Sequence, residues 1–112
     1  MPTSVQFEKA MAALPHPSPK IKKMLKAHYN AKNRTSISRK LAKAAGYKSY
    51  RGFNLQYGLL AKRIGTKMKV KIPSTAIFLL VDFAEPGELK NEEWIIFMRD
   101  EFATALKKVG WV

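Results

Sequence analysis

Apolar side chains recur every three or four residues through the first two thirds of the chain, a spacing that is typical of amphipathic helices. The pattern predicts a short helix over residues 4–14 and a second helix from Ser18 to about Ala31. Ser18 followed by proline suits a helix start, because the hydroxyl caps the first turn and proline has no N–H that needs a partner. His28 lies on the apolar side of the second helix, where a core histidine is more common than a metal ligand.

A helix, a glycine turn and another helix follow. Residues 37–45 are expected to be helical, with Thr35 or Ser36 as the cap. Gly46 ends this helix, because the residue after a helix often adopts a left-handed backbone that glycine tolerates best. The next helix is predicted over residues 50–64. Its apolar stripe consists of Phe53, Tyr57, Leu60 and Ile64.

The opposite face of this helix carries Gly58 together with Arg51, Asn54, Leu55 and Lys62. A glycine in the middle of a helix costs about 1 kcal/mol relative to alanine. We therefore expect Gly58 to let another surface approach closely, either a phosphate backbone or a neighbouring helix.

The pattern changes in the last third of the chain. "MKVKI" (68–72) alternates between apolar and polar residues, which predicts a strand. "AIFLLVDF" (76–83) is typical of a buried strand. "WIIFM" (94–98) is rich in β-branched and aromatic residues and favours a strand, with a helix starting at Asn91 as the alternative.

A final helix is predicted from Asp100, with acids in its first turn and lysines in its last, and Gly110 ends it. Together the elements indicate a single α+β domain over residues 1–112. Residues 1–66 are expected to be mainly helical and to contain a helix-turn-helix-like unit. Residues 67–112 are expected to form a small antiparallel sheet, with a wing-like hairpin, and the C-terminal helix.

Charge is divided very unevenly along this domain. Residues 1–72 hold seventeen Lys or Arg and a single acid, Glu8, which gives +16, whereas residues 73–112 carry a net charge of −3. Such segregation creates a positive face that attracts polyanions. Nucleic acid, and duplex DNA before RNA, is the partner that this face favours. An acidic protein and a solvated lysine surface without a partner are the alternatives.

The helix pair is the part of this basic region that indicates a binding mode. In a helix-turn-helix unit the second helix lies in the major groove and lysines on its flanks meet phosphates. Arg51 can pair with guanine and Asn54 with adenine through two hydrogen bonds each. Tyrosines of this region can stack on unpaired bases or pack in the core. The predicted nucleic-acid-binding residues are Arg39, Lys40, Lys43, Lys48, Ser49, Tyr50, Arg51, Asn54, Lys62, Lys69 and Lys71.

Four motifs in this region and near the C-terminus resemble a known family. "AAGYKSY", "NLQYG", the "MR.E.A.AL" run and the terminal "GW" are similar to a small basic domain attached to HNH-type restriction endonucleases of bacteria. The resemblance covers about residues 35–112 and implies a nucleic-acid-targeting module that works beside a nuclease. No nuclease portion follows Val112, so we expect the module to act alone here.

Nothing in the sequence indicates catalysis. The chain has no Cys, and its two histidines, His16 and His28, are twelve residues apart without metal-ligand spacing. We therefore expect a protein that is not an enzyme and that has no catalytic residues, metal site or cofactor. The N-terminus lacks a secretory leader and the longest apolar run is too short to span a bilayer, which favours a cytoplasmic protein without a membrane partner.

Two further readings stay open. A small inhibitor or accessory protein from a phage or mobile element, of the anti-CRISPR or anti-restriction type, would have a similar charge distribution when it docks on a nucleic-acid-targeting defence complex. The acidic C-terminal third, with Trp94 and Trp111, is a candidate surface for a protein partner or a homodimer contact.

Overall fold

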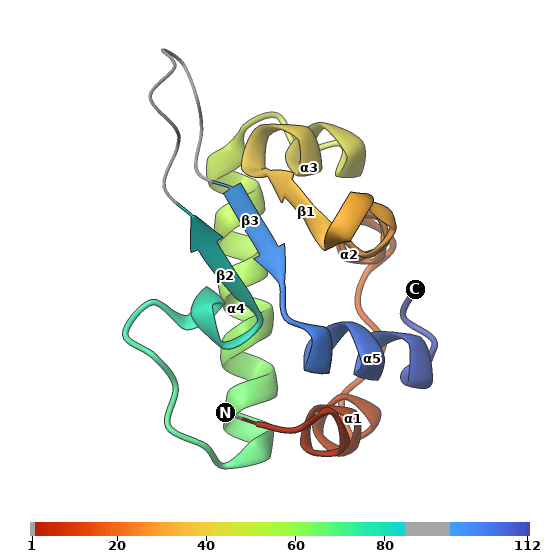
Figure 1. The fold of residues 1–112 in the computed structure, drawn as a ribbon, viewed down its shortest axis with the longest axis vertical. Coiled ribbons are helices and arrows are strands. Elements are labelled where there is room, and N and C mark those ends of the chain that lie inside the picture. Colours follow the sequence, from red (N-terminus) through yellow and green to blue (C-terminus); the bar gives the residue numbers. More distant parts are fainter. Residues whose placement is uncertain (1, 85–94) are drawn as a thin grey trace.

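The computed structural model describes residues 2–84 and 95–112, and it confirms the α+β fold class. Within these residues five α-helices pack around a small antiparallel sheet (Figure 1). In chain order the elements are α1 (Ser4–Ala12), α2 (Pro19–Asn30), the 3-10 helix η1 (Lys32–Arg34), β1 (Thr35–Ile37), α3 (Ser38–Ala45), α4 (Tyr50–Met68), the 3-10 helix η2 (Ala76–Leu79), β2 (Val81–Ala84), β3 (Ile95–Met98) and α5 (Asp100–Val109).

The helix ends follow the local signals of the sequence. The Ser18 hydroxyl accepts a hydrogen bond from the Ile21 N–H (3.3 Å), which confirms the predicted start of α2. Gly46 and Gly110 follow α3 and α5 with φ angles of 84° and 76°, the left-handed backbone that glycine tolerates. α5 begins at Asp100, as the acidic first turn predicts.

The core lies on one side of α4, the longest helix, which runs along the long axis of the molecule (Figure 1). Helices α1, α2, α3 and η2 all contact it. The predicted apolar stripe of α4 is confirmed, because all four of its side chains are buried. α4 also continues four residues beyond the predicted end at residue 64.

The sheet has the strand order β1-β3-β2, with β3 in the centre and antiparallel to both neighbours. Strand β3 confirms the prediction for residues 94–98 over Ile95–Met98, and the start of the alternative helix at Asn91 lies outside the described residues. Strand β1 was not predicted. Thr35 and Ser36 pair with β3 and do not cap α3. A strand of three residues has too short a pattern to be recognised in the sequence, and it forms because a partner strand about 60 residues away lies beside it.

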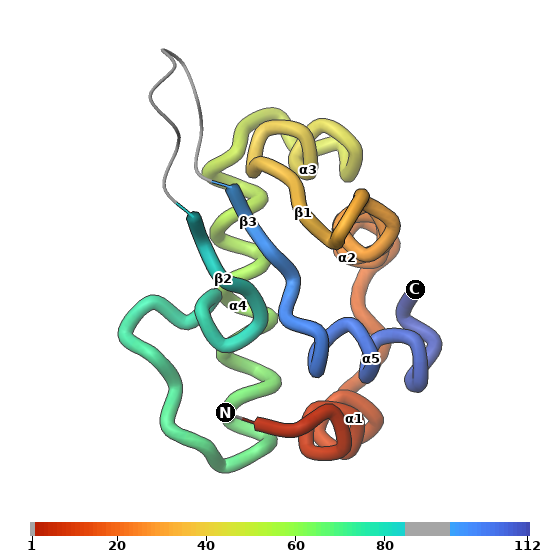
Figure 2. The backbone as a smooth tube through the Cα atoms, in the orientation of Figure 1, coloured from red at the N-terminus to blue at the C-terminus, as the bar shows by residue number. Residues whose placement is uncertain are grey.

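The predicted strand over residues 68–72 is wrong, and so is the wing-like hairpin that it would form. α4 runs on to Met68, and Lys69 takes a left-handed backbone with φ of 59°. The Val70 N–H donates to the Gly65 carbonyl (3.3 Å), which closes the helix. A five-residue alternation fits a helix end as well as a strand when no partner strand is fixed. Figure 2 shows the chain turning after α4 and returning along it to η2.

Residues 76–83, predicted as one buried strand, divide into η2 and β2. Ala76, Ile77 and Leu79 are buried and η2 packs on α4. Only Val81–Ala84 pair with β3, because β3 offers just four residues for pairing.

Arg99 fixes the position of η2 and β2 relative to α5. Its guanidinium donates to the Phe78 carbonyl from Nε (3.1 Å) and Nη2 (2.9 Å). It also makes a two-point ion pair with Asp82, at 3.0 Å from Nη1 and 2.8 Å from Nη2. A planar guanidinium with several bonds holds a fixed geometry, so one side chain joins the start of α5 to the segment around Phe78.

His28 ties three elements together inside the core. Its Nε2 lies 3.1 Å from the Ile96 carbonyl of β3, and its Nδ1 lies 3.0 Å from the Tyr57 hydroxyl of α4. Because a carbonyl only accepts, Nε2 carries the proton and Nδ1 accepts from Tyr57. The predicted core histidine is confirmed by its complete burial. Burial lowers the pKa of His28 to about 4, against the opposing effect of the hydrogen bond to Ile96.

This lowered pKa predicts that acid destabilises the fold. The unfolded chain takes up a proton on His28 near pH 6.5, whereas the folded protein does so only near 4, so stability falls as the pH drops between these values. From pH 7 to pH 5 we expect a loss of about 2 kcal/mol in the free energy of unfolding, measured by urea denaturation.

The two histidines supply the control. His28→Gln should remove most of this pH dependence, and the His16→Gln change in an exposed loop should leave it intact. An NMR titration of the wild-type His28 ring should have its midpoint near 4. A midpoint near 6.5 would contradict the buried neutral tautomer.

Candidate functional site

The residues predicted to bind nucleic acid divide between the two ends of α4. This helix has 19 residues, and at roughly 1.5 Å per residue it is about 28 Å long. Lys48 and Ser49 directly precede it and Arg51 lies in its first turn, whereas Lys62 lies in its last two turns and Lys69 directly follows it. The sequence indicated one continuous basic face. In the structure the cations instead form two basic clusters, which are separated by the middle of α4.

The first cluster surrounds the turn between α3 and α4. The Tyr47 N–H donates to the Ala42 carbonyl (2.9 Å), which closes the end of α3, and four residues lead from there to α4. Ala42 is buried where α3 contacts α4. Turn length and buried alanine agree with the predicted helix-turn-helix-like unit. The exposed cations of this first cluster are Arg39, Lys40, Lys43, Lys48 and Arg51.

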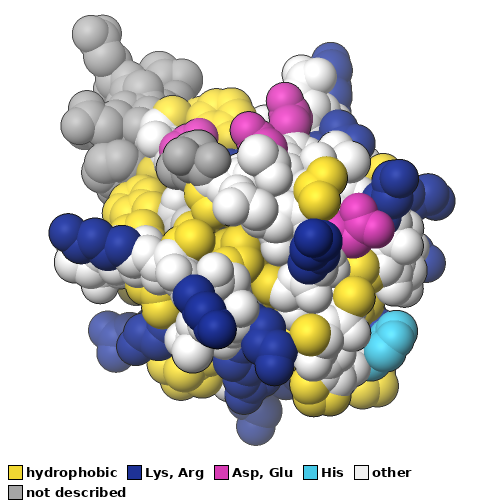
Figure 3. Space-filling model, turned by 90° about the horizontal axis from the view of Figure 1, so that it is seen from below, with side chains coloured by type: hydrophobic (Ala, Val, Ile, Leu, Met, Phe, Trp, Pro, Cys, Tyr) yellow, Lys and Arg dark blue, Asp and Glu magenta, His cyan; other side chains and the backbone are white. Residues whose placement is uncertain are grey.

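The second cluster surrounds a hollow of about 480 Å³ at the C-terminal end of α4. Figure 3 views the molecule from this end, and in the lower half of the view Lys and Arg gather without an Asp or Glu among them. Lys71 is exposed two residues further along but does not line the hollow. The cations that line it, called the basic hollow below, are Lys62, Arg63, Lys67 and Lys69.

Arg63 and Lys67 were missed by the sequence analysis. They became part of the site because α4 continues past residue 64 and places them one turn apart, beside its end. Arg63 and Lys67 are four residues apart, which is the spacing of neighbours on one helix face. Because a strand was predicted over residues 68–72, the helix was expected to end at residue 64, and this spacing was not used. The same error assigned Lys69 to a wing.

The basic hollow has no acidic counterpart among the described residues. The ion pair found in the described part of the chain joins Arg99 to Asp82, on the other side of η2. Four cations that share a hollow of this size repel one another, and an anion bound there would relieve that repulsion. The hollow is therefore suited to phosphate or another polyanion.

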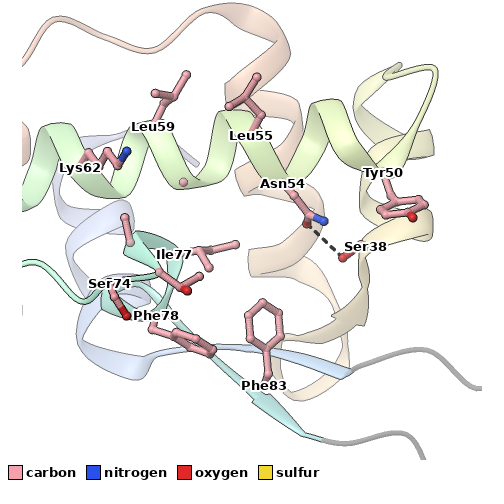
Figure 4. A pocket seen from close by; sticks show the side chains of 13 residues that line it. Ser38, Tyr50, Asn54, Leu55, Leu59, Lys62, Ser74, Ile77, Phe78 and Phe83 are labelled. Atoms are coloured by element: carbon pink, nitrogen blue, oxygen red, sulfur yellow. Dashed lines mark hydrogen bonds between the residues drawn. The ribbon is translucent and has the colours of Figure 1, made fainter.

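Between the two clusters, the open face of α4 lines an apolar groove of about 850 Å³ together with η2 and β2. In Figure 4, Phe78 and Phe83 lie on one side of this face, and Leu55 and Leu59 on the other. Of the predicted site residues, Tyr50, Asn54 and Lys62 line the groove; the other lining residues are Ser38, Leu55, Gly58, Leu59, Ser74, Thr75, Ala76, Ile77, Phe78 and Phe83.

Asn54 is already engaged within the protein. The Ser38 hydroxyl donates to the Asn54 carboxamide oxygen (3.3 Å), so this bond joins α3 to α4 at the edge of the groove (Figure 4). Recognition of adenine needs both the oxygen and the nitrogen of the carboxamide. The bond from Ser38 uses one of the two lone pairs of the Asn54 oxygen, so it constrains the orientation of the carboxamide without blocking a second bond.

The aromatic residues of the prediction have separate roles. Tyr57 is buried in the core beside His28, whereas Tyr50 is half exposed at the groove. Trp111 is buried, so it offers no surface for a partner. Trp94 lies outside the described residues. In the described part of the chain, no three His, Asp or Glu side chains come together as metal ligands.

Two glycines of α4 differ in what surrounds them. A Cβ built on Gly58 would meet nothing within 4 Å, so no part of the described protein requires a glycine there. A Cβ on Gly65 would lie 2.8 Å from Ile72 Cγ1 and 3.0 Å from Leu79 Cδ2. Gly65 thus allows the returning segment and η2 to pack on α4, whereas Gly58 leaves the groove open.

This contrast predicts opposite effects of the same substitution. Gly58→Ala should raise the free energy of unfolding by about 0.5–1 kcal/mol, because it removes the helix cost of glycine without a clash. Gly65→Ala should lower it by about 1 kcal/mol, because overpacking exceeds the same gain. Urea denaturation of both variants measures the difference, and a destabilised Gly58→Ala protein would contradict the open position of Gly58.

In comparisons with known proteins, no protein-family model, no curated protein and no solved structure matches the chain. Among the helices of residues 2–84 and 95–112, none combines the length and the apolar character that a membrane crossing needs. The site therefore has to be interpreted from its own geometry.

Proposed function

We propose that this protein binds nucleic acid without catalysing a reaction on it, and that duplex DNA is its preferred ligand. The observation that carries the proposal is the basic hollow, where four cations line one depression and no described acid pairs with them. Phosphates are the most abundant anions that match such an arrangement of Lys and Arg. The resemblance to a nuclease-linked targeting domain supports the same class of ligand.

The separation of the two clusters favours a polymer over a small anion. A single phosphate satisfies one end of α4, whereas a duplex presents phosphates continuously over a helical turn of about 34 Å. That length is comparable with the distance between the two ends of α4. One duplex segment that follows α4 would therefore contact the cations of both clusters.

Arg51 is the residue of the first cluster best suited to contact a base. It lies in the first turn of α4 and its side chain is exposed, in the region where a helix-turn-helix unit approaches base edges. Asn54, which bonds to Ser38, and the half-exposed Tyr50 face the apolar groove. The arrangement supports binding that depends mainly on phosphate contacts, with Arg51 as the contributor to sequence preference.

Phosphate contacts predict a steep dependence of affinity on salt. Roughly five to eight contacts would give a slope of about −5 to −7 in a plot of log affinity against log salt concentration. Fluorescence anisotropy with a labelled duplex, from about 50 to 300 mM salt, measures the slope. The absence of binding to DNA and to RNA at the lowest salt would contradict the proposal.

Charge reversals should map the binding face. Arg63→Glu with Lys67→Glu, or Lys40→Glu with Lys43→Glu, should each weaken duplex binding by about tenfold or more, because each change replaces attraction to phosphate with repulsion. The matched control is Lys107→Glu with Lys108→Glu in the last turn of α5, which should change the affinity less than about threefold.

All three double variants change the net charge equally, so a general effect of charge would weaken all of them alike. Equal losses would show that binding is diffuse and would remove the two clusters of α4 as the interface. Thermal unfolding of each variant confirms that the fold is intact.

A further inference from the structure

The apolar groove exposes more hydrophobic surface than the folded domain needs. Of the five large apolar side chains that are exposed in the described residues, three line this groove: Leu55 (60% exposed), Tyr50 (52%) and Phe78 (38%). The other two, Val5 and Phe97, do not line it. Clustered apolar exposure marks an interaction surface, whereas isolated apolar residues are ordinary.

The chemistry of the groove does not suit a phosphate backbone. Among the described residues of its lining there is one cation, Lys62, which also lines the basic hollow. The α4 backbone between the two clusters is helical, so its N–H groups are used in bonds to carbonyls one turn earlier and none is free for a phosphate. The apolar floor therefore fits the apolar side chains of a protein partner.

Gly58 indicates where a partner would approach most closely. It lies halfway along the groove wall, and a side chain there would meet no atom of the described protein within 4 Å. Leu55 and Leu59 project together on one side of the helix, away from Phe78 (Figure 4), and at about 100° per residue both lie on the same side of Gly58. A small residue at a crossing point allows two helices to approach, and the larger neighbours then fill the grooves of the second helix.

The form of the groove favours a helix over an added strand. Its walls are side chains of α4 and η2, and β2 contributes only Phe83. A strand that adds to a sheet bonds to the backbone edge of a strand, which here would be β2. The groove instead presents mainly side chains of α4 and η2. An amphipathic helix that inserts apolar residues between two such walls matches the surface.

The charge around the groove indicates which residues flank the apolar face of the partner. Lys62 lies in the groove wall, Arg51 is exposed at the start of the same helix, and no acid is among the lining residues that the structure describes. A second copy of the chain would bring two such basic edges together, and each copy carries a net charge of +13. The complementary occupant therefore has carboxylates beside its apolar stripe.

We propose that the groove between α4, η2 and β2 docks an amphipathic helical segment of a protein partner, with Asp or Glu flanking its apolar face. The segment crosses α4 at Gly58, its apolar side chains fill the space between Leu55 and Phe78, and its acids lie toward Lys62 and Arg51. The inference does not rest on the proposed function, but the two ligands would compete. A duplex that follows α4 covers the groove, and Lys62 and Arg51 also belong to the basic clusters at the ends of the helix.

The test is a selection from a displayed library of random peptides against the full-length protein at physiological salt. A chain of charge +13 retains acidic peptides without a defined site, so the library is first depleted on the Leu55→Glu variant. Selected peptides should share apolar residues at i, i+4 and i+7 with flanking acids. As synthetic peptides, they should bind wild-type protein at least about tenfold more tightly than Leu55→Glu or Phe78→Glu.

Val5→Glu is the matched control, because Val5 is as exposed as Leu55, lies outside the groove and gives the same change in charge. It should bind the peptides within about twofold of wild type. Gly58→Ala should bind them at least about fivefold more weakly, although it unfolds less readily, so lost stability does not explain the loss of binding.

Several results would overturn the proposal. If the peptides bind Val5→Glu and Leu55→Glu equally, they are attracted by charge alone. The same conclusion follows if no peptide in the library binds wild type more tightly than Leu55→Glu. An affinity for a 20-nucleotide oligo(dT) that falls at least about tenfold in Leu55→Glu and Phe78→Glu, but not in Val5→Glu, would assign the groove to bases of nucleic acid. A dimer in sedimentation that Leu55→Glu dissociates would assign the groove to a second copy of the chain.

Discussion

The burial of one face of α4 is the constraint on which the rest of the structure depends. The stripe from Phe53 to Ile64 is closed off from water by α1, α2, α3 and η2, so each of these elements is positioned by the same surface. A helix of 19 residues has room for two functions along its length when only one side of it is buried. The opposite side remains available over nearly the whole length of the helix.

Two polar contacts make this packing specific. His28 is buried with both ring nitrogens bonded, to Tyr57 and to the Ile96 carbonyl, and thereby fixes the sheet against α2 and α4. Arg99 holds the Phe78 carbonyl and Asp82, and thereby fixes the second wall of the groove. A buried polar group costs stability when it loses a partner, so the His28 contacts select one arrangement among several that would bury similar apolar area. The Arg99 contacts lie near solvent, and they fix geometry through the number of bonds that one planar group makes.

The surface of α4 is organised by this packing into charged ends and an apolar middle. Cations gather at the α3–α4 turn and around the basic hollow, whereas the groove between them is lined mainly by apolar side chains. A polyanion is attracted to charge over a long range, and an apolar segment is held by contact over a short one. The two kinds of surface therefore suit ligands of different chemistry, although both lie along one helix.

Much of the fold followed from local sequence. Ser18 before a proline, Gly46 and Gly110 set helix ends, and the stripe on α4 was recognisable because each signal acts within one or two turns. The segregation of charge was equally visible, since net charge needs no folding to be counted. The cations at the start of α4 follow from the same local pattern.

Other features were decided only by tertiary structure. Strand β1 exists because β3 lies beside it, and residues 76–80 are not a strand because β3 is too short to pair with them. The basic hollow depends on the last turn of α4, and the groove on the return of η2 and β2 to the same helix. The sequence by itself determined which residues are apolar, charged or able to end a helix. Which of them meet was determined by packing, because contacts between distant segments depend on the shape of the whole core.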